Sequence, residues 1–279
     1  MRVLRVVLLS LIASLALWCG AEAGDGPERH APIVILSDAE FTAGNGVRSG
    51  AGTVDDPYVI SGWRIHAEMG GNCLRVENVS SAFRIEHCAL VNASGYAVKL
   101  VAVERAEIVD SCISESLFGV LWEWCERCVL RDCSFDQIGW EAVTILESAG
   151  CEITGCLFAE GAPAIGVQGQ SRVNKFVGNV FLSGCRTGIR LDDEGGGNQI
   201  TLNDFYGMFC VSDSYNRWSD AEGNGNYWSR YGGTDQNGDG VGDTPYRVLG
   251  EGIEYDRAPA MAPHHPNAET EWNLCGMME

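Results

Sequence analysis

Three stretches of the sequence repeat one pattern: Cys151-Glu-Ile-Thr-Gly-Cys-Leu-Phe158, Asn174-Lys-Phe-Val-Gly-Asn-Val-Phe181 and Asn198-Gln-Ile-Thr-Leu-Asn-Asp-Phe205. In each, an apolar residue stands three positions before a Cys or Asn, and another stands two positions after it. With looser matches the pattern returns at spacings of 23, 22, 23, 23 and 24 residues, measured between Cys88, Ser111, Cys133, Cys156, Asn179 and Asn203. A fixed period of this length indicates a solenoid, whose repeats bury their apolar faces by stacking on one another.

The rest of each repeat indicates strands rather than helices. Apolar residues alternate with polar ones in pairs such as Val98-x-Leu100 and Val143-x-Ile145, which is typical of half-buried strands. Glycines such as Gly119 punctuate the repeats, and we expect them to provide the left-handed backbone of the corners. We predict an all-β fold, a single-stranded right-handed parallel β-helix of about seven to eight coils of ~23 residues, with a C-terminal cap rich in Gly, Asn and Asp.

A leucine-rich repeat is the alternative, because its signature also carries an Asn or Cys at a period of about 20 to 29 residues. The strand-like alternation counts against it, as do the small or polar residues found five positions before the repeated Cys or Asn.

In a stacked solenoid, equivalent side chains form columns about 4.8 Å apart. Asn174 over Asn198, and Asn179 over Asn203, would then form inward amide ladders that satisfy buried carbonyl groups. Earlier coils hold Cys in the same columns. Those thiols either form a reduced, buried column or bridge vertically, as Cys133 could with Cys156, and the sequence leaves both alternatives open.

The chain reads as one domain between processing and capping segments. Residues 1–23 have the charged start, the apolar core and the Ala-x-Ala ending of a signal peptide, with cleavage expected after Ala23. We assign 24–59 to an N-terminal cap and first strand, 60–220 to the β-helix, 221–259 to a C-terminal cap and 260–279 to a flexible tail. This organisation predicts a secreted or periplasmic protein with no membrane span.

The chain is strongly acidic, with 38 Asp and Glu against 19 Lys and Arg. Removing Arg2, Arg5 and Glu22 with the leader leaves 37 against 17, or a net charge of −20. Such a charge disfavours nucleic acid and anionic membranes, and it suits cations and neutral or basic partners.

The C-terminal cap contains a candidate calcium loop. Asp235, Asn237, Asp239, the Val241 carbonyl and Asp243 stand at positions 1, 3, 5, 7 and 9 of a calcium loop, with glycine at position 6. Position 12 is Tyr246 rather than the usual bidentate Glu, so the last ligand would have to come from elsewhere. A turn that caps the solenoid without a metal is the alternative.

Motifs at the two ends of the chain resemble the NosD-like family of secreted right-handed parallel β-helix proteins, of the carbohydrate-binding and sugar-hydrolase repeat type. They are Asp56-Pro-Tyr-Val-Ile-Ser-Gly-Trp63, Asn226-Tyr-Trp-Ser229 and Asp235-x-Asn-Gly-Asp-Gly-Val-Gly-Asp-Thr-Pro-Tyr246. The resemblance implies an extracytoplasmic location. It also implies a link to copper, because the name-giving member is a periplasmic factor for maturation of the copper site of nitrous oxide reductase.

The ligand types for copper are sparse in the sequence. His264-His265 is the one adjacent His pair, in a tail that also holds Cys275, Met277 and Met278. A bare pair in a tail is more often only polar surface, so calcium is the expected cofactor and copper is not.

Strand parity places several charged side chains on the outer face of the coils. Two exposed aromatic residues, Trp124 and Trp140, are expected to be platforms for a sugar ring. The candidate catalytic residues are Glu77, Lys99, Glu123, Arg190 and Asp192.

We expect a non-catalytic module that binds carbohydrate or another surface partner. A polysaccharide lyase or glycoside hydrolase on the same face, and an accessory factor in copper-enzyme maturation, are the alternatives.

Overall fold

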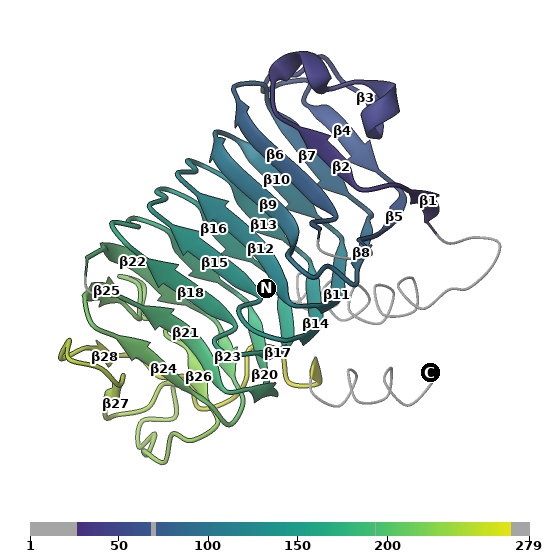
Figure 1. Cartoon of the computed structure of the whole chain (residues 1–279). Helices are drawn as coiled ribbons and strands as arrows, with labels where there is room; N and C mark the ends of the chain where they lie inside the picture. The colour runs from purple at the N-terminus through teal and green to yellow at the C-terminus, as the bar shows by residue number, and fades with distance from the viewer. Residues whose placement is uncertain (1–26, 68–70, 193, 269–279) are drawn as a thin grey trace.

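The computed structural model describes residues 27–67, 71–192 and 194–268, so the predicted signal peptide lies outside the described residues. The described chain is an all-β parallel solenoid, and Figure 1 shows its coils stacked along one axis. A typical coil adds one strand to each of three sheets, called here A, B and C. The predicted fold class is confirmed in these respects.

The strands of each sheet follow one another at intervals of one coil. Sheet A contains β1 (Glu28–His30), β5 (Trp63–His66), β8 (Ala89–Val91), β11 (Cys112–Ser116), β14 (Ser134–Ile138), β17 (Leu157–Gly161), β20 (Val180–Cys185), β23 (Asp204–Phe205) and β26 (Tyr227–Trp228). Sheet B contains β2 (Ile33–Ile35), β6 (Leu74–Val79), β9 (Tyr96–Val103), β12 (Phe118–Glu123), β15 (Val143–Leu146), β18 (Ile165–Gln168), β21 (Thr187–Leu191) and β24 (Phe209–Ser212). Sheet C contains β3 (Val47–Ser49), β4 (Tyr58–Ser61), β7 (Phe83–Glu86), β10 (Ala106–Val109), β13 (Val129–Arg131), β16 (Glu152–Thr154), β19 (Lys175–Val177), β22 (Gly196–Thr201) and β25 (Tyr215–Arg217).

Short elements close the two ends. At the N-terminal end lie the 3-10 turns η1 (Asp38–Glu40) and η2 (Ala43–Asn45), and β3 pairs with β4 in antiparallel fashion. At the C-terminal end, β27 (Tyr246–Arg247) and β28 (Tyr255–Asp256) form an antiparallel pair outside the three sheets. The solenoid therefore has a distinct cap at each end (Figure 1).

The register follows the columns predicted from the sequence period. In sheet C, Ile85 pairs with Ile108, which pairs with Leu130, and the column continues to Ile200. In sheet A, ring centroids are 4.8 Å apart between Phe135 and Phe158 and 4.9 Å apart between Phe158 and Phe181. These distances match the strand spacing, so like side chains stack directly through the core.

The amide ladders are also present. The Asn179 Oδ1 atom accepts the Cys156 backbone N–H at 3.0 Å, and the Asn203 Oδ1 atom accepts the Asn179 N–H at 2.9 Å. The Asn179 Nδ2 group donates to the Ile153 carbonyl at 2.9 Å. In the Cys coils the Cys156 thiol lies 3.7 Å from the Leu130 carbonyl, a weaker contact at the equivalent place.

The corners use a device that the sequence analysis did not predict. Left-handed residues stand one position before the ladder residues, at φ 49° in His87, 45° in Asp110 and 54° in Asp132, and glycine takes this role only in some coils. Gly119 has no left-handed φ, so the expected reason for its presence is wrong. A Cβ atom there would lie 2.1 Å from the Ala142 carbonyl oxygen, so close approach is what requires glycine.

Two carboxylates end the ladders at the C-terminal cap. Asp256 accepts the Asn226 N–H at 2.7 Å and the Trp228 indole N–H at 2.9 Å, and Glu254 accepts the Asn216 N–H and the Trp218 indole N–H. Asp256 is fully buried, and burial raises the pKa of its carboxyl group. The cap therefore supplies the acceptor that a further Asn coil would supply.

Candidate functional site

The outer face of sheet B carries the candidate catalytic residues. Two outward columns cross the coils. The first, from β6 to β24, reads Arg75, Lys99, Leu121, Thr144, Gly166, Arg190 and Val211. The second reads Glu77, Val101, Glu123, Leu146 and Gln168, followed by Asp192 just beyond the end of β21. Four of the five candidate catalytic residues are members of these columns, and Asp192 directly follows one.

The N-terminal part of this face is a closed ion-pair cluster. Glu77 accepts two hydrogen bonds from the Arg75 guanidinium, both at 2.8 Å, and its carboxylate lies 3.3 Å from the Lys99 ammonium. Arg75, aided by Lys99, holds the pKa of Glu77 below its ordinary value despite burial. An ionised carboxylate held in this way is poorly suited to be a general acid.

The remaining candidate catalytic residues lie farther along the face. Glu123 and Glu77 are both in register with Val101, one on each side, which puts them about 9.6 Å apart, or two strand spacings. Arg190 and Asp192 form a separate pair, with 3.2 Å between Nε and Oδ1. The structure therefore joins Glu77 to Lys99, and Arg190 to Asp192, but leaves Glu123 in neither pair.

A hollow of about 480 Å³ opens beside the second pair. It is lined by Leu146, Gln168, Gly169, Arg190, Asp192, Glu194, Asp213 and Glu251. The Asp213 Oδ1 atom accepts a hydrogen bond from the Glu251 backbone N–H at 2.8 Å. The last coil and the C-terminal cap therefore form one wall of the hollow together.

The two predicted aromatic platforms lie at opposite edges of sheet B. Trp140 comes before β15, at the corner with sheet A, and Trp124 follows β12, at the corner with sheet C. Their exposed fractions are 55% and 59%. Leu117 is exposed beside Trp140, and the backbone N–H of Trp140 donates to the Leu117 carbonyl. Trp124 has φ 51°, a left-handed conformation that is rare for a bulky residue.

The candidate calcium loop lies on the surface of the C-terminal cap, and its side chains hydrogen-bond to their own backbone. Asp235 accepts the N–H groups of Gly238 and Gly240 at 2.7 and 2.9 Å, and Asp243 accepts that of Gln236 at 2.9 Å. The Asn237 amide donates to Asp239 at 2.9 Å. The ring of Tyr246, at position 12, stacks on that of Trp228, with 4.2 Å between the ring centroids. Asp235, Asn237, Asp239, Val241 and Asp243 thus lie in one surface loop, but the carboxylates do not converge on a common point, and calcium binding there stays a prediction.

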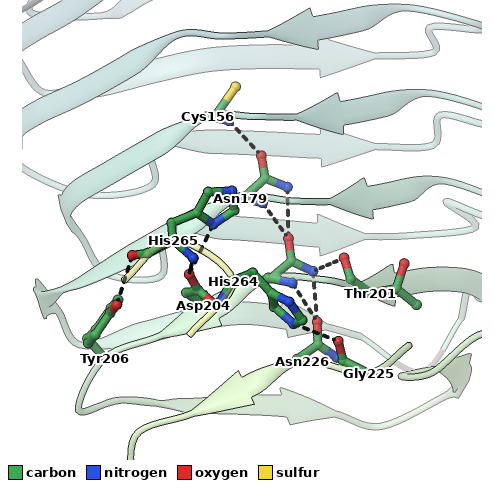
Figure 2. A network of polar contacts seen from close by, with 10 residues as sticks. Cys156, Asn179, Thr201, Asp204, Tyr206, Gly225, Asn226, His264 and His265 are labelled. Carbon is green, nitrogen blue, oxygen red and sulfur yellow. Dashed lines mark hydrogen bonds and ion pairs between the residues drawn. The ribbon is translucent and has the colours of Figure 1, made fainter. Parts of the chain in front are cut away.

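The first part of the expected C-terminal tail, 260–268, packs on the outer face of sheet A. The Asp204 carboxylate is fully buried and accepts the backbone N–H groups of His264 at 2.8 Å and of His265 at 2.6 Å, and its Oδ2 atom lies 3.0 Å from His265 Nδ1 (Figure 2). Ala268 is buried in an apolar cluster with Leu157 and Val180. Cys275, Met277 and Met278 lie outside the described residues.

Copper binding stays a question for the two histidines of this segment. The His264 Nε2 atom lies 3.1 Å from the Gly225 carbonyl and the His265 Nδ1 atom lies 3.0 Å from Asp204 Oδ2, so these contacts use one ring nitrogen of each imidazole. Nine of the ten cysteines in the described part of the chain are free and buried, and burial raises the pKa of Cys73 to about 11 and of Cys88 to about 12. Across the part of the chain that the structure describes, no group of three or more His, Cys, Asp or Glu side chains forms a metal site.

Several residues of this face were missed in the sequence. The period breaks in the last coil, so Asp213 could not be placed in a column, and Glu251 belongs to a cap that has no repeat. Gly166 belongs to the first column, and counting the repeats would have found it.

A repeated coil of about 23 residues and the capped ends define a parallel β-solenoid. Within 27–67, 71–192 and 194–268, no helix is long and apolar enough to cross a membrane. A family model described as periplasmic copper-binding protein (NosD) matches residues 44–233, and the chain belongs to this family.

Two further comparisons add no evidence on function. No curated protein matches the chain. The crystal structure of an alginate lyase from Paenibacillus sp. str. FPU-7 is similar, with a TM-score of 0.46 and 12% identity over 72% of this chain and 77% of that one. A likeness at this level carries no information about activity.

Proposed function

We propose that the protein is a secreted or periplasmic, non-catalytic module that binds carbohydrate along the outer face of sheet B. One observation carries the proposal: a polar face that crosses several coils, with the 480 Å³ hollow in it and exposed Trp140 and Trp124 at its edges. Sugar hydroxyl groups find hydrogen-bond partners in carboxylates and amides, and the apolar face of a sugar ring packs on an aromatic ring.

The arrangement of carboxylates favours binding over hydrolysis or elimination. A glycoside hydrolase uses one carboxyl group as an acid and a second as a base or nucleophile. Here Glu77 is held ionised by Arg75 and Lys99, and Asp192 is paired with Arg190, so neither carboxyl group is suited to the role of the acid. A lyase or hydrolase remains the alternative, and it predicts release of new chain ends from a bound polymer.

A glycan array with the protein lacking residues 1–23, combined with a reducing-end and unsaturated-product assay, tests the proposal. We expect binding without release, weakened by Trp140→Ala and unchanged by Glu152→Gln on the outer face of sheet C. Release that disappears in Glu123→Gln would establish the enzyme instead. No bound glycan at all would refute the module.

An accessory role in copper-enzyme maturation is the second candidate, and the description of the family favours it. The test is a titration with Cu(I) against a competing chelator. A stoichiometric site that is lost in a His264→Ala, His265→Ala double variant would support it. If the protein does not compete with the chelator for Cu(I), the copper binding named in the family description does not apply to this chain.

A further inference from the structure

Cys112, at the start of β11, differs from the nine free cysteines of the described chain because it is disulfide-bonded. The sequence holds twelve cysteines, so the nine free ones and Cys112 itself leave Cys19 and Cys275 as its possible partners. Cys19 belongs to the leader that we expect to be removed after Ala23. In the mature chain Cys275 is then the partner that remains.

Cys112 belongs to a column of buried side chains on the outer face of sheet A. Its neighbour Ile113 fills the core, so Cys112 points to the outer face by strand alternation. In the register this column reads Ala89, Cys112, Ser134, Leu157, Val180 and Asp204. None of these six residues is more than 9% exposed, although the outer face of a sheet ordinarily meets solvent. Part of the chain therefore covers this column.

The segment 260–268 covers one end of the column. Asp204 accepts the backbone N–H of His264 at 2.8 Å (Figure 2), and Ala268 is buried in one apolar cluster with Leu157. Asp204 and Leu157 lie two coils apart in the register, so the segment runs along the face toward the N-terminal coils. Cys112 lies two coils farther in the same direction, outside that cluster.

The chain beyond residue 268 has the length and the residue spacing to reach Cys112. Two strand spacings separate Leu157 from Cys112, or about 9.6 Å. The seven residues from Ala268 to Cys275 span about 10 Å as an α-helix and about 23 Å when extended. Ala268, Trp272 and Cys275 follow one another at spacings of four and three residues, which is the spacing of one helix face. A helix that starts against sheet A at Ala268 would thus direct Trp272 and Cys275 to the same sheet.

We propose that residues 269–279 lie along the outer face of sheet A and are fixed there by a disulfide bond between Cys112 and Cys275. The C-terminal segment is then a covalent strap over the coils from β11 to β23. Formation of the bond joins the two sulfur atoms, releases two protons and passes two electrons to an oxidising disulfide, which is reduced to two thiols. The strap closes the outer face of sheet A, so a ligand that binds along the coils must use another sheet.

The other thiols do not compete for Cys275. They are buried, and burial raises the pKa of Cys73 to about 11 and of Cys88 to about 12. Thiol–disulfide exchange requires a thiolate that the attacked disulfide can reach, and a buried thiol with a raised pKa meets neither condition. A bond of this kind also persists in an oxidising compartment, which agrees with the expected location outside the cytoplasm.

The test is a thiol count on the protein that lacks residues 1–23 and has folded in an oxidising compartment. This chain has eleven cysteines, and two of them in the bond leave nine free thiols in the denatured, unreduced protein. We expect nine thiols to react before reduction and eleven after it. Cys275→Ser should raise the first count to ten, because Cys112 is set free. Cys133→Ala is the matched control, and it should lower the count to eight because Cys133 is already free.

Peptide mapping identifies the two partners. After the free thiols are alkylated, trypsin without reductant should yield peptide 106–127 linked to peptide 258–279, which contains no Lys or Arg. In the native protein, mild reduction should open two thiols to alkylation, those of Cys112 and Cys275, while the nine buried thiols stay protected. The opposite changes of the count in the two variants separate a bonded cysteine from a free one, whatever either variant does to folding.

Three outcomes would overturn the proposal. Eleven reactive thiols before reduction would mean that Cys112 pairs only with Cys19 of the leader. A species of twice the mass that reduction removes would place Cys275 in a bond between two chains. A linked peptide that joins Cys112 to a core cysteine would leave the C-terminal segment without its anchor. None of these outcomes bears on glycan binding, so the proposed function is tested separately.

Discussion

Replacing Asn203 by Ala tests the amide ladder at its centre. The Asn203 side chain accepts the Asn179 N–H at 2.9 Å and donates to the Phe176 carbonyl at 2.9 Å, to the Thr201 carbonyl at 3.0 Å and to Asn226 Oδ1 at 2.9 Å. The Ala variant leaves at least the Asn179 N–H and the Phe176 carbonyl unpaired in the core. At about 1–3 kcal/mol for each group, the free energy of unfolding should fall by about 2–6 kcal/mol.

Urea-induced unfolding followed by circular dichroism measures this loss, with Cys133→Ala as the matched control. Cys133 occupies the same column but makes only weak thiol contacts, with 3.7 Å from its sulfur to the Ile108 carbonyl. Its removal should cost about 1 kcal/mol. Amide hydrogen exchange of the peptide 174–181 shows whether the loss is local, because a solenoid can open in parts. Equal costs for the two variants would refute the reasoning, since the ladder bonds would then add nothing beyond packing.

The other predictions concern the corner residue Gly119, the cap residue Asp256, the candidate calcium loop and the clasp, which is the contact of Asp204 with His264 and His265. Gly119→Ala should lower the free energy of unfolding in urea by about 1–3 kcal/mol, because the added Cβ would meet the Ala142 carbonyl. An unchanged free energy of unfolding would mean that the neighbouring coils can move apart without cost. Burial raises the pKa of Asp256, so the native state holds its proton more tightly than the unfolded state and this contribution to stability declines as pH rises from the ordinary Asp pKa through the raised one. Asp256→Asn should flatten that slope in melts across pH, and an unchanged slope would contradict the assignment. Calcium should raise the melting temperature, and chelator or Asp239→Ala should remove the rise; a midpoint indifferent to all three would end the calcium prediction. Asp204→Ala should make the segment 260–268 the first site of limited proteolysis, and equal resistance would show that the clasp is held elsewhere.

The period of the sequence was sufficient for the fold because stacking repeats every environment. Ile153, Cys156 and Phe158 needed only their neighbours one coil away to be assigned to the core, and the register confirms each of these placements. The corners escaped prediction because a left-handed residue there points outward into solvent. Trp124, His87 and glycine all serve, and no residue type marks the position.

Only part of the candidate site could be predicted from the sequence. Glu77, Lys99, Arg190 and Asp192 belong to or directly follow repeating columns, so parity placed them on the outer face. Their pairing depends on rotamers that a period does not encode. The far wall of the hollow, formed with Glu251, comes from a cap whose chain path is set by tertiary packing. The clasp between Asp204 and His265 joins segments 61 residues apart and has no sequence signal.

The most direct test of the functional account is a hydrogen-exchange map of the protein with and without a saturating amount of a glycan that binds on the array. We predict slower exchange in peptides covering β12, β15, β18 and β21, centred on residues 143–146 and 165–168, and no change in β13, β16 and β19 of sheet C. Protection confined to sheet C, or to the loop 235–243, would contradict the assignment of the outer face of sheet B as the binding surface.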